Sequence, residues 1–183
     1  MNRLPTQLAA TCDGQALGRN FSRSELLGMI PKTVEQLLEI ETEDAAEQMM
    51  DDEASVFVVD WREMDDAIVE YCEDILQTGD LEAEVNDIDD DPGIEMFISH
   101  GGQRVQVPLK VGDEDRHITL YTLNELLKPA YEIRVCVASL GSDTLVFLPL
   151  PAADWKDLEE RHGEKVAKHF LPIQQRPNLF TGK

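Results

Sequence analysis

The clearest pattern in the chain is an apolar stripe between residues 64 and 76. Its apolar members recur at spacings of three and four, which is the period of a helix with one buried face. Asp60 stands in the position of an N-cap, and Gly79 follows the last apolar residue as a helix terminator. The pattern therefore predicts an amphipathic helix, and its apolar stripe consists of Met64, Ala67, Ile68, Tyr71, Cys72, Ile75 and Leu76.

Short apolar runs of strand length lie on both sides of this helix. Two of them flank His100-Gly101-Gly102-Gln103, and two others flank Gly141-Ser142, so each pair predicts a β-hairpin. The acidic stretch 81–93 is expected to be a connector that ends in a turn at Asp89-Asp90-Asp91-Pro92-Gly93. The predicted strands are residues 54–59, 94–99, 104–111, 132–139 and 143–148.

Further helices are expected near residues 33–50, over 118–127 and from Asp154 to about Phe170. Gly163 is a weak point in the last helix, and Pro172 ends it. Strands joined as hairpins pair antiparallel, which favours an α+β fold over a doubly wound sheet. We therefore expect an antiparallel sheet built from hairpins with helices packed on one face, in the order α-β-α-β-β-α-β-β-α.

The same pattern divides the 183 residues into three parts. Residues 1–32 have weak periodicity and are predicted to be an irregular or helical N-terminal segment. Residues 33–173 are long enough to form a single α+β domain with its own core. Residues 174–183 read as a polar tail.

Charge is the outlier in composition, with a formal net charge of -21. Residues 35–91 contain 23 acidic residues and one basic residue, Arg62, whereas the rest of the chain has 14 acidic and 15 basic residues. A surface that only promotes solubility, or one adapted to a salty cytoplasm, would distribute its acids more evenly. A disordered acidic tail would lack the apolar run Val56–Val59. The concentration of acids instead favours a recognition surface for a basic partner.

Several classes of chemistry lack their sequence signals. Cys12, Cys72 and Cys136 form neither a CxxC motif nor a disulfide framework. Asp87, Asp89 and Asp91 have the first spacings of a calcium loop, but Pro92 and Ile98 stand where that loop needs Gly and Glu. The sequence has no GxSxG, GxGxxG or GxxxxGK[ST] motif and no HExxH. We therefore expect a protein that is not an enzyme and that has no metal or cofactor.

Targeting signals are also missing. Residues 1–14 lack the apolar core of roughly 7–15 residues that a signal peptide needs. No stretch approaches the roughly 18 apolar residues of a membrane span. A strongly acidic chain is a poor ligand for nucleic acid or anionic lipid, since phosphate binding needs clustered Lys and Arg. We expect a cytoplasmic monomer or homodimer with no direct nucleic-acid or membrane partner.

In charge and size the chain resembles the acidic immunity and antitoxin-type inhibitor proteins of bacteria. The resemblance implies a protein that neutralises a basic partner, such as a toxin or an enzyme that acts on nucleic acid, because complementary charge speeds encounter and suppresses wrong partners. The predicted binding residues are acids on the helix and in the stretches beside it: Asp51, Asp52, Asp66, Glu70, Glu73, Asp74, Asp87, Asp89, Asp90 and Asp91.

Two other functions remain open. The alternation of helices and hairpins and the low pI are similar to those of type III secretion chaperones, which are small acidic α+β dimers that hold an exported client in apolar grooves. The acidic face could also imitate the phosphates of DNA, which would make the protein a DNA-mimic inhibitor.

Overall fold

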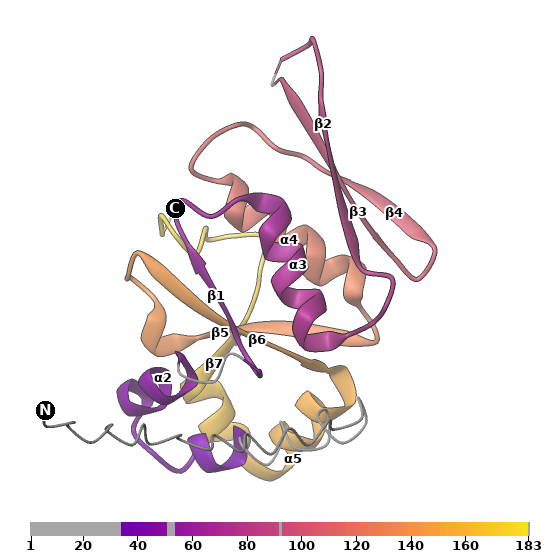
Figure 1. Cartoon of the computed structure of the whole chain (residues 1–183). Coiled ribbons are helices and arrows are strands. Elements are labelled where there is room, and N and C mark those ends of the chain that lie inside the picture. Colours follow the sequence, from indigo (N-terminus) through magenta and orange to yellow (C-terminus); the bar gives the residue numbers. More distant parts are fainter. Residues whose placement is uncertain (1–33, 51–53, 92, 183) are drawn as a thin grey trace, which may run out of the picture.

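The computed structural model describes residues 34–50, 54–91 and 93–182, and in it the strands form two separate antiparallel sheets (Figure 1). The α+β class is confirmed, and the order of elements roughly matches the expected one. The helices are α2 (Thr42–Met50), α3 (Asp65–Leu76), α4 (Asp115–Leu127) and α5 (Ala152–His169), with a short 3-10 turn, η1 (Val137–Ser139). The strands are β1 (Phe57–Asp60), β2 (Glu82–Asp87), β3 (Ile94–His100), β4 (Gln103–Val107), β5 (Tyr131–Cys136), β6 (Thr144–Pro151) and β7 (Phe170–Pro172).

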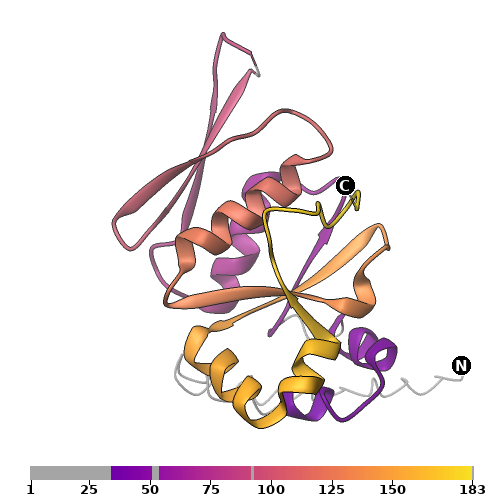
Figure 2. The same ribbon diagram turned by 180° about the vertical axis from the view of Figure 1, so that it is seen from behind.

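The core is built around the four-stranded sheet, whose order is β1-β6-β5-β7. Helices α3 and α4 cover one face of this sheet, and α2 and α5 cover the other (Figures 1 and 2). This differs from the expectation of helices on one face only. The reason is visible in β6, where the whole run Leu145–Leu150 is buried, as in strands that are covered on both sides. The predicted strand after Ala54 is confirmed as β1, which pairs with β6 through Phe57 and Phe147.

The three-stranded sheet, in the order β2-β3-β4, corrects the prediction of a connector over 81–93. Residues Glu82–Asp87 form β2, which pairs with β3 along its full length. The acidic side chains of β2 alternate with Ala83 and Val85, which gives the segment the two-residue period of a strand. Ala83 and Val85 lie opposite Ile98 and Met96 of β3. The predicted hairpin between β3 and β4 is confirmed. Gly101 and Gly102 both have positive φ there (60° and 76°), as a type I′ turn requires.

This second sheet packs across α3 and α4 and then extends past them. Met96 and Ile98 of the central strand are fully buried, α3 lies along β2, and α4 lies along β4. The other end of the sheet, with the β2–β3 turn, projects away from the helices (Figure 1). Val85, on the edge strand β2, is 45% exposed.

The C-terminal region begins with α5 and also differs from the expected course. The predicted weak point is confirmed as a kink, because His162, next to Gly163, has non-helical φ and ψ. The helix ends at His169 and not at Pro172, and residues 170–172 form β7, an edge strand, where proline is tolerated. Asn178, in the expected polar tail, is buried, and Leu179 and Phe180 pack against the core. The predicted segment 1–32 lies outside the described residues.

The expected N-cap of α3 has another role. Asp60 is the last residue of β1, and its carboxylate accepts a hydrogen bond from the Arg62 backbone N–H at 2.8 Å. The residue at the N-cap position is Met64, which has no capping side chain. Asp60 therefore stabilises the turn between β1 and α3 and not the first turn of the helix.

Candidate functional site

The acids nearest the N-terminal end of the acidic region are neutralised by helix α5. Lys165 Nζ lies 2.6 Å from Glu39 Oε2, and Lys168 Nζ lies 3.2 Å from Glu41 Oε2. Arg161 forms a third ion pair, with Glu35. The hydrogen bond and the charge of Lys165 hold the pKa of Glu39 below its usual value. The strong excess of acids in residues 35–91 is thus partly balanced across the fold.

Three acids on α3 have no basic partner of this kind among the described residues. Asp66, Glu70 and Asp74 repeat at intervals of four residues and therefore form one stripe along the helix. The opposite face of α3 is buried through Ile68, Cys72 and other apolar residues, which fixes the acidic stripe toward solvent. Glu70 and Asp74 are exposed and Asp66 is half-buried. Within the described residues, none of these three carboxylates forms an ion pair or a side-chain hydrogen bond.

A shallow hollow of about 370 Å³ lies between α3 and β2. Glu70 and Asp74 line it from the helix, and Glu82 lines it from the strand. The Glu82 carboxylate is exposed and also lacks a cation among the residues that the structure describes. Sequence reasoning missed Glu82 because it assigned residues 81–93 to a connector, although the alternation of Glu82 and Glu84 with small apolar residues was a usable signal.

Glu73 lines the same hollow but has a structural role. Its carboxylate accepts hydrogen bonds from the Thr78 N–H at 3.0 Å, the Thr78 hydroxyl at 2.6 Å and the Gly79 N–H at 2.5 Å. These bonds close the C-terminal end of α3, where Gln77 adopts the left-handed conformation. Glu73 is therefore already engaged within its own loop, unlike its neighbour Asp74.

The remaining predicted residues form a second group. Asp87 ends β2, and Asp89, Asp90 and Asp91 are exposed in the turn that follows. A six-residue strand spans roughly 20 Å, so this turn lies about one strand length from the hollow beside Asp74. The structure therefore brings Glu70, Glu73 and Asp74 together and keeps the turn apart from them. Asp51 and Asp52 lie outside the described residues.

Other acids of this region are engaged within the fold. Asp80 accepts the Gly101 N–H at 2.9 Å and lies 2.9 Å from His100 Nδ1, which joins the loop after α3 to the β3–β4 turn. Glu84 forms an ion pair of 2.8 Å with Arg104, whose guanidinium also stacks on Phe97. The Gly101 N–H and His100 lower the pKa of the Asp80 carboxyl. A hydrogen bond from the Asn86 side chain at 3.0 Å, together with Arg104, lowers the pKa of the Glu84 carboxyl.

Large apolar side chains lie at the N-terminal end of the acidic stripe. Trp61 is 51% exposed and Met64 is 66% exposed, both in the turn between β1 and α3. Arg62 stacks on the Trp61 ring at 4.6 Å. Trp, Met and Arg are enriched in protein–protein interfaces. Trp61 could not be identified from the sequence pattern, because a single Trp in a turn carries no periodic signal.

The described part of the chain offers little for metal or thiol chemistry. Among the residues described, no group of three His, Cys, Asp or Glu side chains converges on a point where a metal ion could bind. Cys72 and Cys136 are free and buried, and burial raises the pKa of both thiols. Raised pKa values keep these thiols protonated and unreactive at neutral pH.

Comparison with known proteins identified no relative of this chain. A scan against protein-family models, a search of curated proteins and a search of solved structures each found no match to this chain. Among the described residues, none of the helices is both long and apolar enough to cross a membrane.

Proposed function

We propose that the protein binds a basic protein partner through an acidic face formed by Asp66, Glu70, Asp74 and Glu82, and that it neutralises that partner in the manner of an immunity or antitoxin protein. The single observation that carries the proposal is the division of charge across the fold. Acids near residues 35–41 have cations from α5, whereas the carboxylates of the acidic face have none among the described residues.

Uncompensated acids on one helix lower its stability. Like charges four residues apart destabilise a helix by about 0.2–0.5 kcal/mol per pair, and the stripe has two such pairs. A basic partner would relieve this repulsion on binding. Complementary fields would also accelerate the encounter, most strongly at low salt.

Trp61 and Met64 supply the apolar part of this interface. Charge alone gives an interface its rate and selectivity, while buried aromatic and long apolar side chains give most of its affinity. The two residues lie in the turn immediately before α3, and Met64 is two positions from Asp66. The free buried thiols fit a reducing compartment, so we place the interaction in the cytoplasm.

The first test is a pull-down from lysate at low salt, eluted with a salt gradient. The baits are the wild-type chain, a D66K/E70K/D74K variant and an E47K/D113K/E164K control that changes net charge equally. The three control acids are exposed and lie outside the acidic face. We expect the wild type and the control to retain one basic protein that elutes at moderate salt, and the face variant to lose it. Equal retention by all three baits would contradict the proposal.

The alternative functions make different predictions in the same assay. A DNA-mimic inhibitor would retain a nucleic-acid-binding protein that duplex DNA displaces in competition. A chaperone-like protein would hold its client by apolar burial, and that client would resist high salt. The apolar hollow lined by Leu140, Leu171 and Phe180 is the place where such a client would bind.

A further inference from the structure

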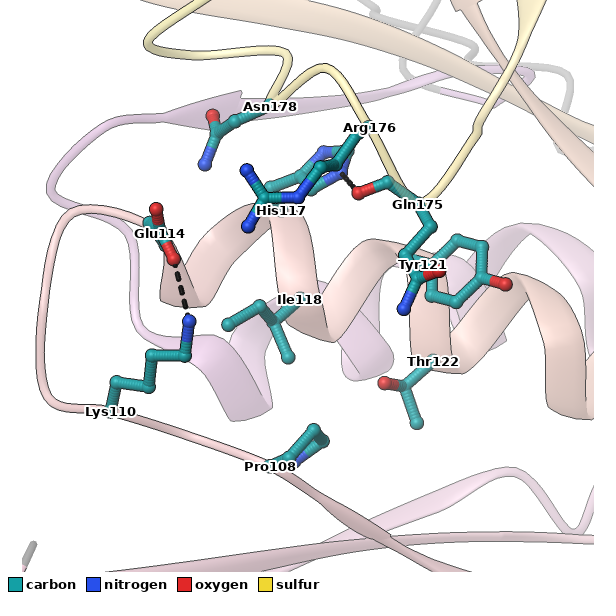
Figure 3. Close-up of a pocket in the computed structure, with 10 residues that line it drawn as sticks. All are labelled: Pro108, Lys110, Glu114, His117, Ile118, Tyr121, Thr122, Gln175, Arg176 and Asn178. Atoms are coloured by element: carbon teal, nitrogen blue, oxygen red, sulfur yellow. Dashed lines mark hydrogen bonds and ion pairs between the residues drawn. The ribbon is translucent and has the colours of Figure 1, made fainter. Parts of the chain in front are cut away.

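A second pocket lies at the N-terminal end of α4, away from the acidic face. The loop before the helix supplies Pro108, Lys110 and Glu114, and the helix supplies His117, Ile118, Tyr121 and Thr122. The C-terminal segment closes it with Gln175, Arg176 and Asn178 (Figure 3). Its volume is about 270 Å³, close to the roughly 300 Å³ at which small-molecule sites begin.

Several polar groups of this pocket already have partners within the fold. Lys110 Nζ lies 2.8 Å from Glu114 Oε2, so these two side chains neutralise each other. His117 Nδ1 accepts the Leu179 N–H at 3.3 Å, which leaves Nε2 to donate to the Gln175 carbonyl at 3.2 Å. Burial lowers the pKa of His117 and keeps it neutral. Asn178 Oδ1 accepts from the backbone N–H groups of Phe180 and Thr181 at 2.8 and 3.0 Å.

Two donors of the pocket, one buried and one charged, have no partner among the described residues. Asn178 is 5% exposed, and its Nδ2 has no acceptor among the described residues. The amide cannot flip to relieve this, because Oδ1 is fixed by its two backbone donors. Arg176 is exposed, and its guanidinium makes no hydrogen bond or ion pair with any described residue. Both side chains face the interior of the pocket (Figure 3).

The loop in front of the pocket is held in an unusual conformation. The buried Asp115 carboxylate accepts the backbone N–H groups of Lys110 and Gly112 at 2.9 and 3.1 Å. Between them Val111 has a φ of 54°, which is rare for a β-branched residue. Such conformations persist only where the surroundings impose them, and they concentrate at ligand sites.

We propose that this pocket binds a small monocarboxylate. The carboxylate would accept hydrogen bonds from the Arg176 guanidinium and from Asn178 Nδ2, and the apolar part would lie on Ile118, Pro108 and the Tyr121 ring. One uncompensated cation matches one negative charge. A phosphate dianion would leave an excess charge beside Glu114, in a protein whose net charge is already -21.

The test is a titration of the full chain with 3-phenylpropionate, followed by ¹H–¹⁵N NMR. The neutral 3-phenylpropanamide and inorganic phosphate serve as comparison probes. We expect saturable shifts of the Asn178 side-chain NH₂ and of the Leu179 amide with the carboxylate, and at least tenfold weaker binding of the amide. Equal binding of acid and amide, preference for phosphate, or no saturable shift at millimolar probe would each overturn the proposal.

Two variants separate binding from folding. Arg176→Gln changes an exposed side chain, and we expect it to weaken 3-phenylpropionate binding by about tenfold or more while the fold persists. Asn178→Asp keeps the acceptor for Phe180 and Thr181 but removes the donor, and we expect it to abolish binding. Lys156→Gln, on the exposed side of α5, is the control for loss of one positive charge. Unchanged affinity in Arg176→Gln would also overturn the proposal.

Discussion

Glu73 and Asp74 are neighbouring acids on α3 with different roles. Both oxygens of the Glu73 carboxylate accept hydrogen bonds from Thr78 and Gly79, whereas the Asp74 carboxylate faces the hollow beside β2 without a partner among the described residues. The difference follows from helix geometry, because only Glu73 points toward the loop that leaves the helix. Glu73 therefore stabilises the C-terminal end of α3, whereas the Asp74 carboxylate is available to bind a partner.

Replacement of each acid by alanine tests this division. We expect Glu73→Ala to lower the free energy of unfolding by about 1–2 kcal/mol, since its loop N–H groups lose a charged acceptor. Asp74→Ala should leave stability unchanged or raise it slightly and should weaken partner binding. Urea denaturation measures the first effect. Equal stability losses in the two variants would contradict the assignment.

His117 makes the attachment of the C-terminal segment sensitive to pH. Burial lowers its pKa, so the unfolded chain takes up a proton on this group at a higher pH than the folded chain does. Its contribution to stability is complete above the unfolded value near 6.5 and is lost as the pH falls below it. A protonated ring would also donate from Nδ1 and could not accept the Leu179 N–H.

We expect the stability difference between the wild type and His117→Gln to shrink from pH 7.5 to pH 5.5. The comparison with this variant removes the titration of the many carboxyl groups from the measurement. Urea denaturation at the two pH values gives the result. A difference that stays constant, or one that grows toward pH 5.5, would show that His117 does not hold the segment in this way.

At the scale of elements, α3 carries a stripe that lowers its own stability. Asp66, Glu70 and Asp74 repel one another, and among the described residues no lysine or arginine is paired with them. Glu70→Lys would convert both repulsive pairs into attractive ones. We expect it to raise the free energy of unfolding by about 0.8–2 kcal/mol and to weaken partner binding. A loss of stability in this variant would contradict the account of the stripe.

The elements also show which parts of the fold a sequence can predict. Helix α3 could be predicted because its apolar residues repeat over three turns, and the β3–β4 hairpin because Gly101 and Gly102 fit one turn type. Strand β2 gives a weaker signal, because only Ala83 and Val85 alternate with its acids and Val85 is half exposed. The pairing of β1 with β6 joins residues about ninety positions apart, and local periodicity carries no information on it.

The candidate sites also differ in how far they could be predicted from the sequence. The acidic stripe was predictable because charge and helical period can be counted along the chain. The function of Glu73 as a helix-end acceptor could not be separated from that of Asp74 without the course of the loop. Arg176 and Asn178 of the second pocket lie about sixty residues from His117, and only the folded chain brings them together.

At the scale of the whole molecule, a net charge of -21 opposes compaction. Ion pairs between α5 and residues 35–41 remove part of the repulsion, while the acidic face and the turn at Asp89–Asp91 remain exposed. We expect added salt to raise stability, because screening weakens repulsion between exposed acids. The urea midpoint should therefore increase from low salt to about 0.5 M NaCl. A midpoint that falls would show that the ion pairs outweigh the repulsion.

The most direct test of the acidic face is the affinity for the purified basic partner as a function of salt. We would measure the Kd at several NaCl concentrations for the wild type, D66K/E70K/D74K and the charge-matched E47K/D113K/E164K control. We predict that binding by the wild type and the control weakens steeply with salt, and that the face variant binds at least a hundredfold more weakly at low salt with a shallower dependence. Equal salt dependence and affinity in all three proteins would contradict the acidic face as the binding surface.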